Sequence, residues 1–432
     1  MTPQANLTVF APVTAGREDA LRSLLESMNT QPGAANALNG LIPFGALGEL
    51  HFARLVILDD PTLGDCALYH LPRPNYPVYL ALLCDFDGSF DAFVKKLVQV
   101  AAEGLRRIFT HCTDFDPALD LERWLKTHHV RPATCYVNWV GRTMLEVREE
   151  SALTDALRAF MSANPAVANL EPRQLHQSLR NFAAAEQKAG RLTLTAEKAT
   201  PLGWVIGNFL HLIGVPLALL ALAPFLLLYA PIYVLLLRSK ERSDPEFAPR
   251  PDAEHAARLS ALEDYDVTNQ FSAFGSIKPG LFRRWTLIFL LWVIDYTARH
   301  IYRHGRLARV NTIHFARWVF IDNKNRLFFA SNYDGSLDSY MDDFINKVAF
   351  GLNVVFSNGI GYPTTNWLAL DGAKDEQKFK YYIRRHELPT EVWYNAHPGL
   401  TALDLARNRL IRQGLENAAI SEMELQQWIQ IL

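Results

Sequence analysis

The sequence predicts an α+β fold made of two βαββαβ repeats, with an apolar helical hairpin inserted between them. The stretch His51–Asp59 (HFARLVILD) recurs as His314–Asp322 (HFARWVFID), with six of nine positions identical. Two more pairs follow in the same order: Asp85–Ser89 with Asn332–Ser336, and Pro132–Asn138 with Pro389–Asn395. Three pairs in one order indicate a duplicated domain. A long uncharged run between the copies predicts the hairpin.

Each repeat contains strands and helices in the same order. Strands are indicated by β-branched and aromatic runs, and helices by apolar residues at helical spacing. In the first repeat we expect strands at 7–13, 51–59, 79–84 and 134–139, with helices at 17–28 and 90–109. In the second repeat we expect strands at 270–277, 313–322, 326–332 and 391–394, with helices at 280–304 and 337–356. The last strand is expected to close its own repeat.

This order is that of the ferredoxin-like fold. Two such units in one chain resemble the dimeric α+β barrel superfamily, over residues 5–145 and 268–415. The resemblance implies that two ferredoxin-like sheets face each other, form an α+β barrel and enclose a cavity.

The segment between the repeats has no charged side chain from Ala199 to Leu237. One membrane crossing needs about 20 apolar residues, so one span fits and two barely do. If both repeats share one barrel, the segment must return to the side it left. Basic residues flank it on both sides, and three prolines allow a bend: Arg191, Lys198, Arg238, Lys240, Arg242; Pro216, Pro224, Pro231. We expect a re-entrant or shallow helical hairpin at the cytoplasmic face; a buried hairpin in a soluble protein is the alternative.

The first helix of the second repeat strengthens the membrane hypothesis. Its apolar stretch of ten residues, 285–294, is too short to span a bilayer. Trp285 and Trp292 suit the boundary between lipid and water, and basic residues stand at both ends: Arg283, Arg284, Arg299, His300, Arg303, His304, Arg306. An interfacial helix and a helix packed on its own sheet are both compatible with this pattern.

Composition limits the classes of protein to consider. The 43 basic and 45 acidic residues nearly balance, so we expect no nucleic-acid partner. The first residues lack the basic and apolar regions of a signal peptide, so we expect a cytoplasmic start. The four cysteines include no CxxC pair and are expected to be reduced, without a metal site.

The predicted organisation has six parts. They are a first repeat at 1–150, a helical connector at 151–200, the membrane-inserting hairpin at 201–238, a linker at 239–266, a second repeat at 267–415 and a C-terminal helix at 416–432.

Candidate site residues lie at strand ends and on the repeated strand. Alternation places His314 and Trp318 on one face and Arg317 on the other. A guanidinium is costly to bury without partners, so Arg54 and Arg317 are expected to face a polar cavity. The aspartates of the two Asp-Gly-Ser turns can act chemically or can cap the helix that follows. Candidate catalytic residues are Arg317, Asp334, His314 and His397; candidate ligand-binding residues are Arg54, Trp318, Tyr333 and Asn395.

The sequences Cys84–Gly88 and Ser331–Gly335 resemble the GxxDG motif of dye-decolourising peroxidases, which are tandem ferredoxin-like proteins. The first glycine of the motif is missing in both copies. The resemblance implies haem as a cofactor, with His397, His314 and His304 as candidate axial ligands. Dinucleotide, P-loop, nucleophile-elbow and zinc-protease motifs are absent from the sequence.

Two functional hypotheses follow. The first is an enzyme at the cytoplasmic face of the inner (cell) membrane that acts on a lipid-like or hydroperoxide substrate in an oxidative, peroxidase-like reaction, with Arg317 binding an anionic group. The second is a non-catalytic lipid-binding or scaffold protein at the same membrane. Membrane lipid and a lipid-like small molecule are the expected partners in both.

Overall fold

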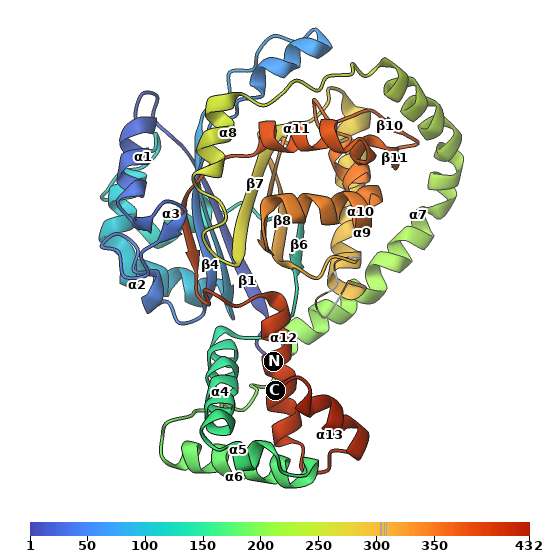
Figure 1. Cartoon of the computed structure of the whole chain (residues 1–432). Coiled ribbons are helices and arrows are strands. Elements are labelled where there is room, and N and C mark those ends of the chain that lie inside the picture. Colours follow the sequence, from blue (N-terminus) through green and yellow to red (C-terminus); the bar gives the residue numbers. More distant parts are fainter. Residues whose placement is uncertain (303–304, 306, 308) are drawn as a thin grey trace.

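The computed structural model describes residues 1–302, 305, 307 and 309–432. It is an α+β protein with two four-stranded antiparallel sheets that stand face to face (Figure 1). In sheet order, the first contains β1 (Gln4–Pro12), β5 (Tyr79–Asp87), β4 (Leu50–Leu58) and β12 (Thr390–Asn395). The second contains β6 (Thr134–Val137), β8 (Ile313–Ile321), β9 (Arg326–Asp334) and β7 (Thr268–Ser276). Two short ribbons pair β2 (Asn29–Gln31) with β3 (Ala34–Ala35), and β10 (Thr365–Asn366) with β11 (Leu370–Asp371).

Helices cover the outer face of each sheet, and each sheet has its own outer core (Figure 1). The first sheet carries α1 (Glu18–Glu26), α2 (Phe90–Phe109) and α3 (Leu121–Thr127). The second carries α9 (Leu281–His300), α10 (Leu337–Phe356) and α11 (Glu376–His386). The apolar faces predicted from helical spacing are thus buried against the sheets.

The inner faces of the two sheets pack directly on each other. Phe10, Val56 and Leu83 of the first sheet contact Val319 and Phe328 of the second in a buried core. Side chains therefore fill this part of the space between the sheets.

The fourth strand of each repeat joins the sheet of the other repeat, so the expectation that it closes its own repeat is wrong. Strand β6 pairs with β8, and β12 pairs with β4. The residues just before each of these strands still bond to their own repeat: Val130 N–H donates to Thr8 O at 2.8 Å, and Leu388 N–H donates to Ser272 O at 2.8 Å. Each chain segment thus crosses from one sheet to the other and ties the repeats together.

The inserted segment forms one helix rather than a hairpin. Helix α7 (Leu202–Ser243) runs unbroken for 42 residues, or about 63 Å at 1.5 Å per residue. Pro216, Pro224 and Pro231 lie inside it, eight and seven residues apart, which is close to two helical turns. They bend the helix toward similar sides without ending it, and Figure 1 shows α7 bowing around the helices of the second sheet.

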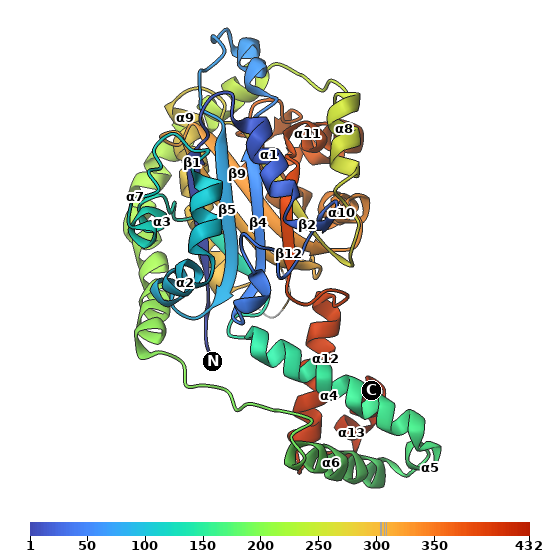
Figure 2. The ribbon, with the colours of Figure 1, turned by 90° about the vertical axis from the view of Figure 1, so that its left-hand side faces the viewer.

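The remaining helices form a separate lobe. It contains α4 (Met144–Ala163), α5 (Pro165–Ala168), α6 (Pro172–Lys188), α12 (Ala402–Glu416) and α13 (Glu422–Ile429). These helices share a core of their own, and Figure 2 shows them below the sheets. Helices α5 and α6 lie within 151–200, where the sequence predicts a helical connector, and α13 lies within 416–432, where it predicts a C-terminal helix. The linker that follows α7 carries one short helix, α8 (Ala253–Ser260).

Candidate functional site

Two buried His–Asp pairs occupy corresponding positions in the two repeats. Nε2 of His51 lies 2.8 Å from Oδ1 of Asp87, and Nε2 of His314 lies 2.7 Å from Oδ1 of Asp334. Each histidine sits at a register shift, between Leu50 and Phe52 in β4 and between Ile313 and Phe315 in β8. Such a bulge turns a side chain away from simple alternation. His314 therefore lines the same cavity as Phe315, and its expected placement on the Trp318 face is wrong.

The second oxygen of each aspartate holds a helix of the lobe. Oδ2 of Asp87 accepts from Met144 N at 2.7 Å, and Oδ2 of Asp334 accepts from Ala402 N at 2.7 Å. These are the first residues of α4 and α12, where a negative charge is favourable. The expectation that the aspartates cap the helix following their own turn is wrong, because Ser89 and Ser336 hold those N-cap positions.

The glycines of the two Asp-Gly-Ser turns have a left-handed backbone conformation. Gly88 and Gly335 both have φ of 88°, which side chains of L-residues rarely adopt.

A third histidine, His397, lies beside the second pair. Its ring centroid is 5.6 Å from that of His314 and 4.9 Å from that of Phe52. Among the described residues its buried Nδ1 has no hydrogen-bond partner. Burial lowers the pKa of His397 well below its ordinary value, and His314 and His51 add to this shift. The His397 ring is therefore neutral near pH 7.

The three histidines line a cavity of about 40 Å³, together with Arg142 and other residues from both sheets and the lobe. A water molecule needs at least about 10–15 Å³ measured in this way, so the space suits one or a few waters. Asp87 holds Nε2 of His51, and Asp334 holds Nε2 of His314. In each of these two rings, Nδ1 is therefore the nitrogen left to accept a proton from a small molecule. The arrangement can act as a pair of bases on a very small molecule, but a haem macrocycle does not fit between these residues as they stand.

Arg54 and Arg317 each reach from one sheet to the other. Arg54 donates to the carbonyl of Phe271 at 2.7 Å and of Ser331 at 2.8 Å, to Ser272 Oγ at 3.0 Å, and to Asn332. Arg317 donates to Leu7 O at 3.2 Å, to Thr8 Oγ1 at 2.8 Å, and to Asp85. The guanidinium groups thus bond corresponding strands of the opposite repeat.

The two arginines differ in one of the side chains that accept their hydrogen bonds. Arg317 meets a carboxylate, Asp85, whereas Arg54 meets the amide of Asn332. Burial lowers the pKa of Arg54 to about 9; Arg317 lowers it further and Asp85 opposes the shift. Two buried cations therefore share one carboxylate, which leaves a net positive charge between the sheets.

Of the other candidate ligand-binding residues, Asn395 lies beside the three histidines, whereas Trp318 and Tyr333 lie apart from them. Trp318 packs on Phe329 at 4.8 Å and Tyr333 stacks on Tyr340 at 3.9 Å, both in the outer core of the second sheet. Asn395 lies next to the site, because its Oδ1 accepts the backbone N–H of His397 at 3.0 Å. Of the sequence-based candidates, the structure brings together His314, Asp334, His397 and Asn395, whereas Trp318 and Tyr333 serve the outer core.

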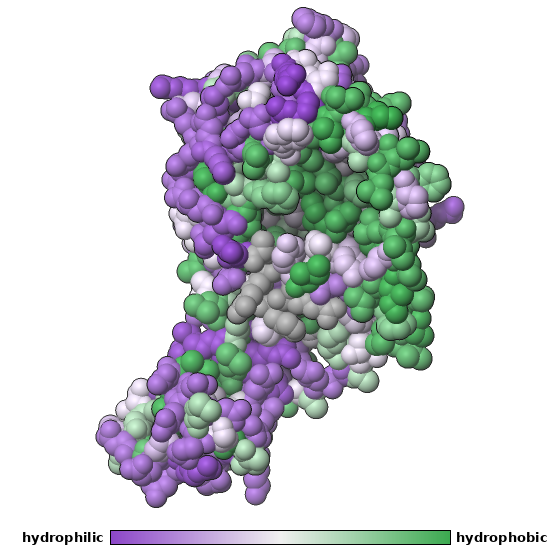
Figure 3. Space-filling model, turned by 90° about the vertical axis from the view of Figure 1, so that its right-hand side faces the viewer, coloured by the Kyte–Doolittle hydropathy of each residue, from purple (hydrophilic) through white to green (hydrophobic). Residues whose placement is uncertain are grey.

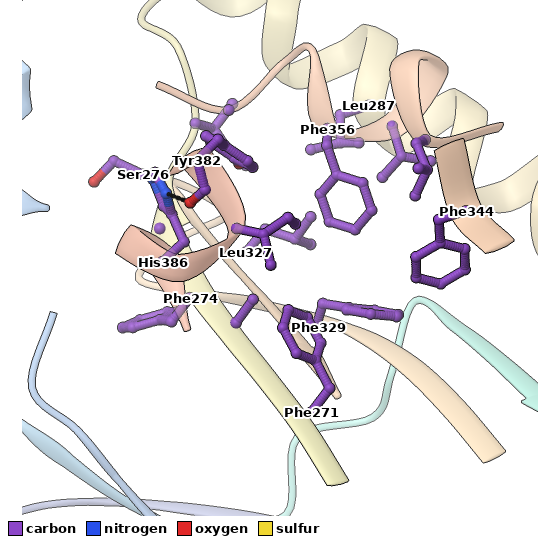
Figure 4. A pocket seen from close by; sticks show the side chains of 17 residues that line it. Phe271, Phe274, Ser276, Leu287, Leu327, Phe329, Phe344, Phe356, Tyr382 and His386 are labelled. Carbon is purple, nitrogen blue, oxygen red and sulfur yellow. Dashed lines mark hydrogen bonds between the residues drawn. The ribbon is translucent and has the colours of Figure 1, made fainter. Parts of the chain in front are cut away.

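A second small cavity lies between the second sheet and α10 and α11, and Figure 4 shows its mostly apolar lining. Its volume is about 30 Å³. His386 bonds through Nδ1 to Tyr382 O at 2.9 Å, and burial lowers the pKa of His386 to about 4. This cavity has a single neutral histidine that faces aromatic rings. It is therefore better explained as a small gap in the packing of the core than as a catalytic site.

Helix α7 gives the molecule an extensive apolar surface. It is the one helix among the described residues that is long and apolar enough to cross a membrane, and only 6% of its most apolar window is buried. Figure 3 shows hydrophobic side chains over α7 and in the hollow beside it, whereas the helical lobe is hydrophilic. The neighbouring α9 exposes Leu281 and Trp285, and α10 exposes Phe350. Three basic positions predicted near this surface, 303, 304 and 306, lie outside the described residues.

Both ends of α7 are fastened to the same folded body. Near its start, Nδ1 of His211 lies 2.8 Å from Nε2 of His300 on α9. Near its end, Glu241 accepts the backbone N–H of Leu368 at 2.6 Å. Just beyond, Asp244 pairs with the buried side chains of Lys278 at 2.8 Å and Arg283 at 2.5 Å. The helix is therefore a strap, attached at its two ends and exposed between them.

Comparison of the chain with known protein families, curated proteins and solved structures finds no match. The α+β architecture with two antiparallel sheets therefore rests on the structure alone.

Proposed function

We propose that the protein is a monotopic membrane protein that binds lipid-like molecules at the cytoplasmic face of the cell membrane. The exposed strap α7 carries this proposal. A helix that is apolar on all sides is normally buried in protein or in lipid, and α7 exposes Phe225, Leu227 and Leu228 at 71%, 74% and 78%. A bilayer is the medium that covers such a surface most simply.

The attachment of both ends supports a helix that lies in the membrane without crossing it. A spanning helix carries its ends to opposite sides of a hydrocarbon core of about 30 Å. Since His211 and Asp244 both bond to the folded body, α7 would stay on one side and bury its outward surface in the leaflet. Basic residues before α7 and in its last turns would face anionic headgroups.

The same proposal includes the barrel and its superfamily. Isolated bridges join Val9 to His129 and Ala273 to Glu387 across the two seams between the sheets. These bridges and the exchanged strands support two sheets that act as one α+β barrel, of the kind the superfamily resemblance implies. The barrel would form the rigid body that holds the strap against the membrane.

Flotation with lipid vesicles tests the membrane proposal. The variant Leu220→Gln/Leu227→Gln/Leu228→Gln changes three side chains that are 71%, 74% and 78% exposed, so the fold should persist. Since burying each leucine contributes about 1.5–3 kcal/mol, the variant should stay in the soluble fraction while the wild type floats. The matched control, Leu38→Gln/Leu403→Gln/Met423→Gln, alters residues of similar exposure elsewhere and should float. Equal flotation of both variants would contradict the proposal.

An enzyme is the second candidate, and the three-histidine cavity favours it. Here His51 and His314 would act as bases on a small molecule such as a hydroperoxide, with Asp87 and Asp334 fixing the ring orientations. A Soret band in the purified protein would support the oxidative, haem-dependent form of this hypothesis and would require the cavity to open. Colourless protein with co-purified lipid would favour the binding protein.

A further inference from the structure

A large cleft lies between the strap and the second sheet. Its volume is about 1160 Å³, at or above the roughly 300–1,000 Å³ of typical small-molecule pockets. One wall comes from α7 and α9 and includes Trp204, Ile288 and Trp292. The other wall comes from β6 and β8 and their flanking turns. The cleft thus has large apolar side chains next to the surface that we place in the membrane, among polar ones such as Asn208.

The charged groups of the cleft leave a positive excess. Each of its carboxylates already has a cationic partner: Asp85 has Arg317, Asp295 has Arg299 at 3.4 Å, and Asp322 has Arg326 at 2.5 Å. Arg131 and Lys324 also line the cleft and are exposed, and neither forms an ion pair with any residue that the structure describes. Behind Arg317 lies Arg54, which adds to the positive charge.

The two unpaired cations lie at the same end of the cleft. Thr134 pairs with Trp318 in the antiparallel register of β6 and β8. Arg131, three residues before Thr134, is therefore next to the end of β8, where the chain turns through Lys324. The unpaired charge is thus concentrated at one end of a groove whose helical wall carries Trp204 and Trp292 beside the paired Asp295 and Arg299.

We propose that this cleft binds one anionic phospholipid, with the phosphate at Arg131 and Lys324 and the acyl chains along Trp204 and Trp292. The inference rests on the proposed function, because a lipid would enter from the leaflet that holds α7. Guanidinium and ammonium groups are the side chains that hold phosphate oxygens with charge-assisted hydrogen bonds. The surplus charge distinguishes an anionic phospholipid from a neutral one.

Tryptophan quenching in neutral detergent micelles tests the proposal with full-length protein. The probes are phosphatidylglycerol and phosphatidylcholine with brominated acyl chains, which quench indoles that they touch. Phosphatidylglycerol should quench saturably, and phosphatidylcholine only in proportion to its amount. The variant Trp204→Phe/Trp292→Phe should lose the saturable part, which would place the bound chains in the cleft.

Charge variants decide the headgroup assignment. Arg131→Gln/Lys324→Gln should weaken phosphatidylglycerol binding about ten- to a hundred-fold or more, as expected for lost hydrogen bonds between charged groups. Lys95→Gln/Arg107→Gln removes two exposed cations from α2, far from the cleft, and should bind like the wild type. Unchanged binding by the first variant, or equal binding of the two lipids, would overturn the proposal.

Flotation separates this inference from the proposed function. Both charge variants should float with phosphatidylcholine vesicles as the wild type does, because α7 is intact. Wild-type protein that floats but shows no saturable quenching would overturn the cleft alone. Wild-type protein that does not float would overturn the membrane proposal.

Discussion

The two repeats have the same kinds of residue between the sheets and differ in the helices on their outer faces. Both contain a bulged histidine paired with an aspartate, an arginine that reaches the opposite sheet, and a glycine with φ of 88°. On the outside, the first repeat has a nine-residue amphipathic helix, α1, where the second has the twenty-residue apolar helix α9. The groups that hold the sheets together are thus present twice, whereas the apolar surface belongs to one side of the molecule. This difference separates residues that maintain the fold from residues that meet a partner.

The largest expected difference between the repeats concerns the two arginines. Arg317→Met would leave Asp85 buried without its ion-pair partner, which costs about 3–5 kcal/mol of unfolding free energy. Arg54→Met would remove hydrogen bonds to two carbonyls, a hydroxyl and an amide, none of them charged, and should cost less, about 1–3 kcal/mol. Urea denaturation of both variants measures these values. Equal losses would mean that the Asp85/Asn332 difference has no energetic consequence.

The two His–Asp pairs should respond alike. Asp87→Asn and Asp334→Asn each weaken a bond to a histidine and a bond to a helix start, and each should cost about 1.5–3 kcal/mol. Amide hydrogen exchange should rise at the start of α4 in the first variant and of α12 in the second. Exchange that rises in only one of these helices would show that the pairs have diverged in role.

Acid should reveal a difference between His386 and His129, two histidines that precede the exchanged strands β12 and β6. Burial lowers the pKa of fully buried His386 to about 4, and lowers that of half-buried His129. Between pH 6.5 and about 4 the unfolded chain binds more protons at position 386, so stability falls as the pH falls, by up to about 1.4 kcal/mol per pH unit. His386→Gln should flatten this dependence more than His129→Gln does. Denaturation curves at several pH values provide the comparison, and the opposite order would contradict it.

The smallest effect concerns the turn glycines. Gly88→Ala and Gly335→Ala should each cost about 1 kcal/mol, because both backbones have φ of 88° and space for a methyl group is present. Thermal denaturation of the pair should give equal shifts. A much larger loss at one position would indicate a neighbour that only that repeat contains.

The sequence predicts the order of strands and helices well, because duplication repeats the same hydrophobic pattern. It cannot reveal that β6 and β12 exchange sheets, since a strand's composition is the same whichever neighbour it joins. Alternation also misplaced His314, because a one-residue bulge is invisible in a pattern of alternating side chains. For α7 the three prolines predicted a hairpin, whereas the structure has one bent helix that contains all three.

Part of the candidate site could be predicted from the sequence, because the repeat and the ends of the strands mark its residues. His314, Asp334 and Asn395 were found from the repeat and from strand ends, and they do lie together near His397. Their counterparts His51 and Asp87 carry the same sequence signal and form the other His–Asp pair. Arg131 and Lys324 gave no signal, because only the fold brings a strand edge and a turn to the same cleft.

The position of the two ends of α7 relative to the membrane tests the central claim most directly. In a Cys135→Ser background, single cysteines at Lys188 and Glu254, both exposed and on either side of α7, can be labelled with an impermeant maleimide in sealed vesicles. Both positions should react from the same side of the membrane and be protected together from the other side. Labelling of the two positions from opposite sides would mean that α7 crosses the bilayer, which would contradict a strap fastened at both ends to one folded body.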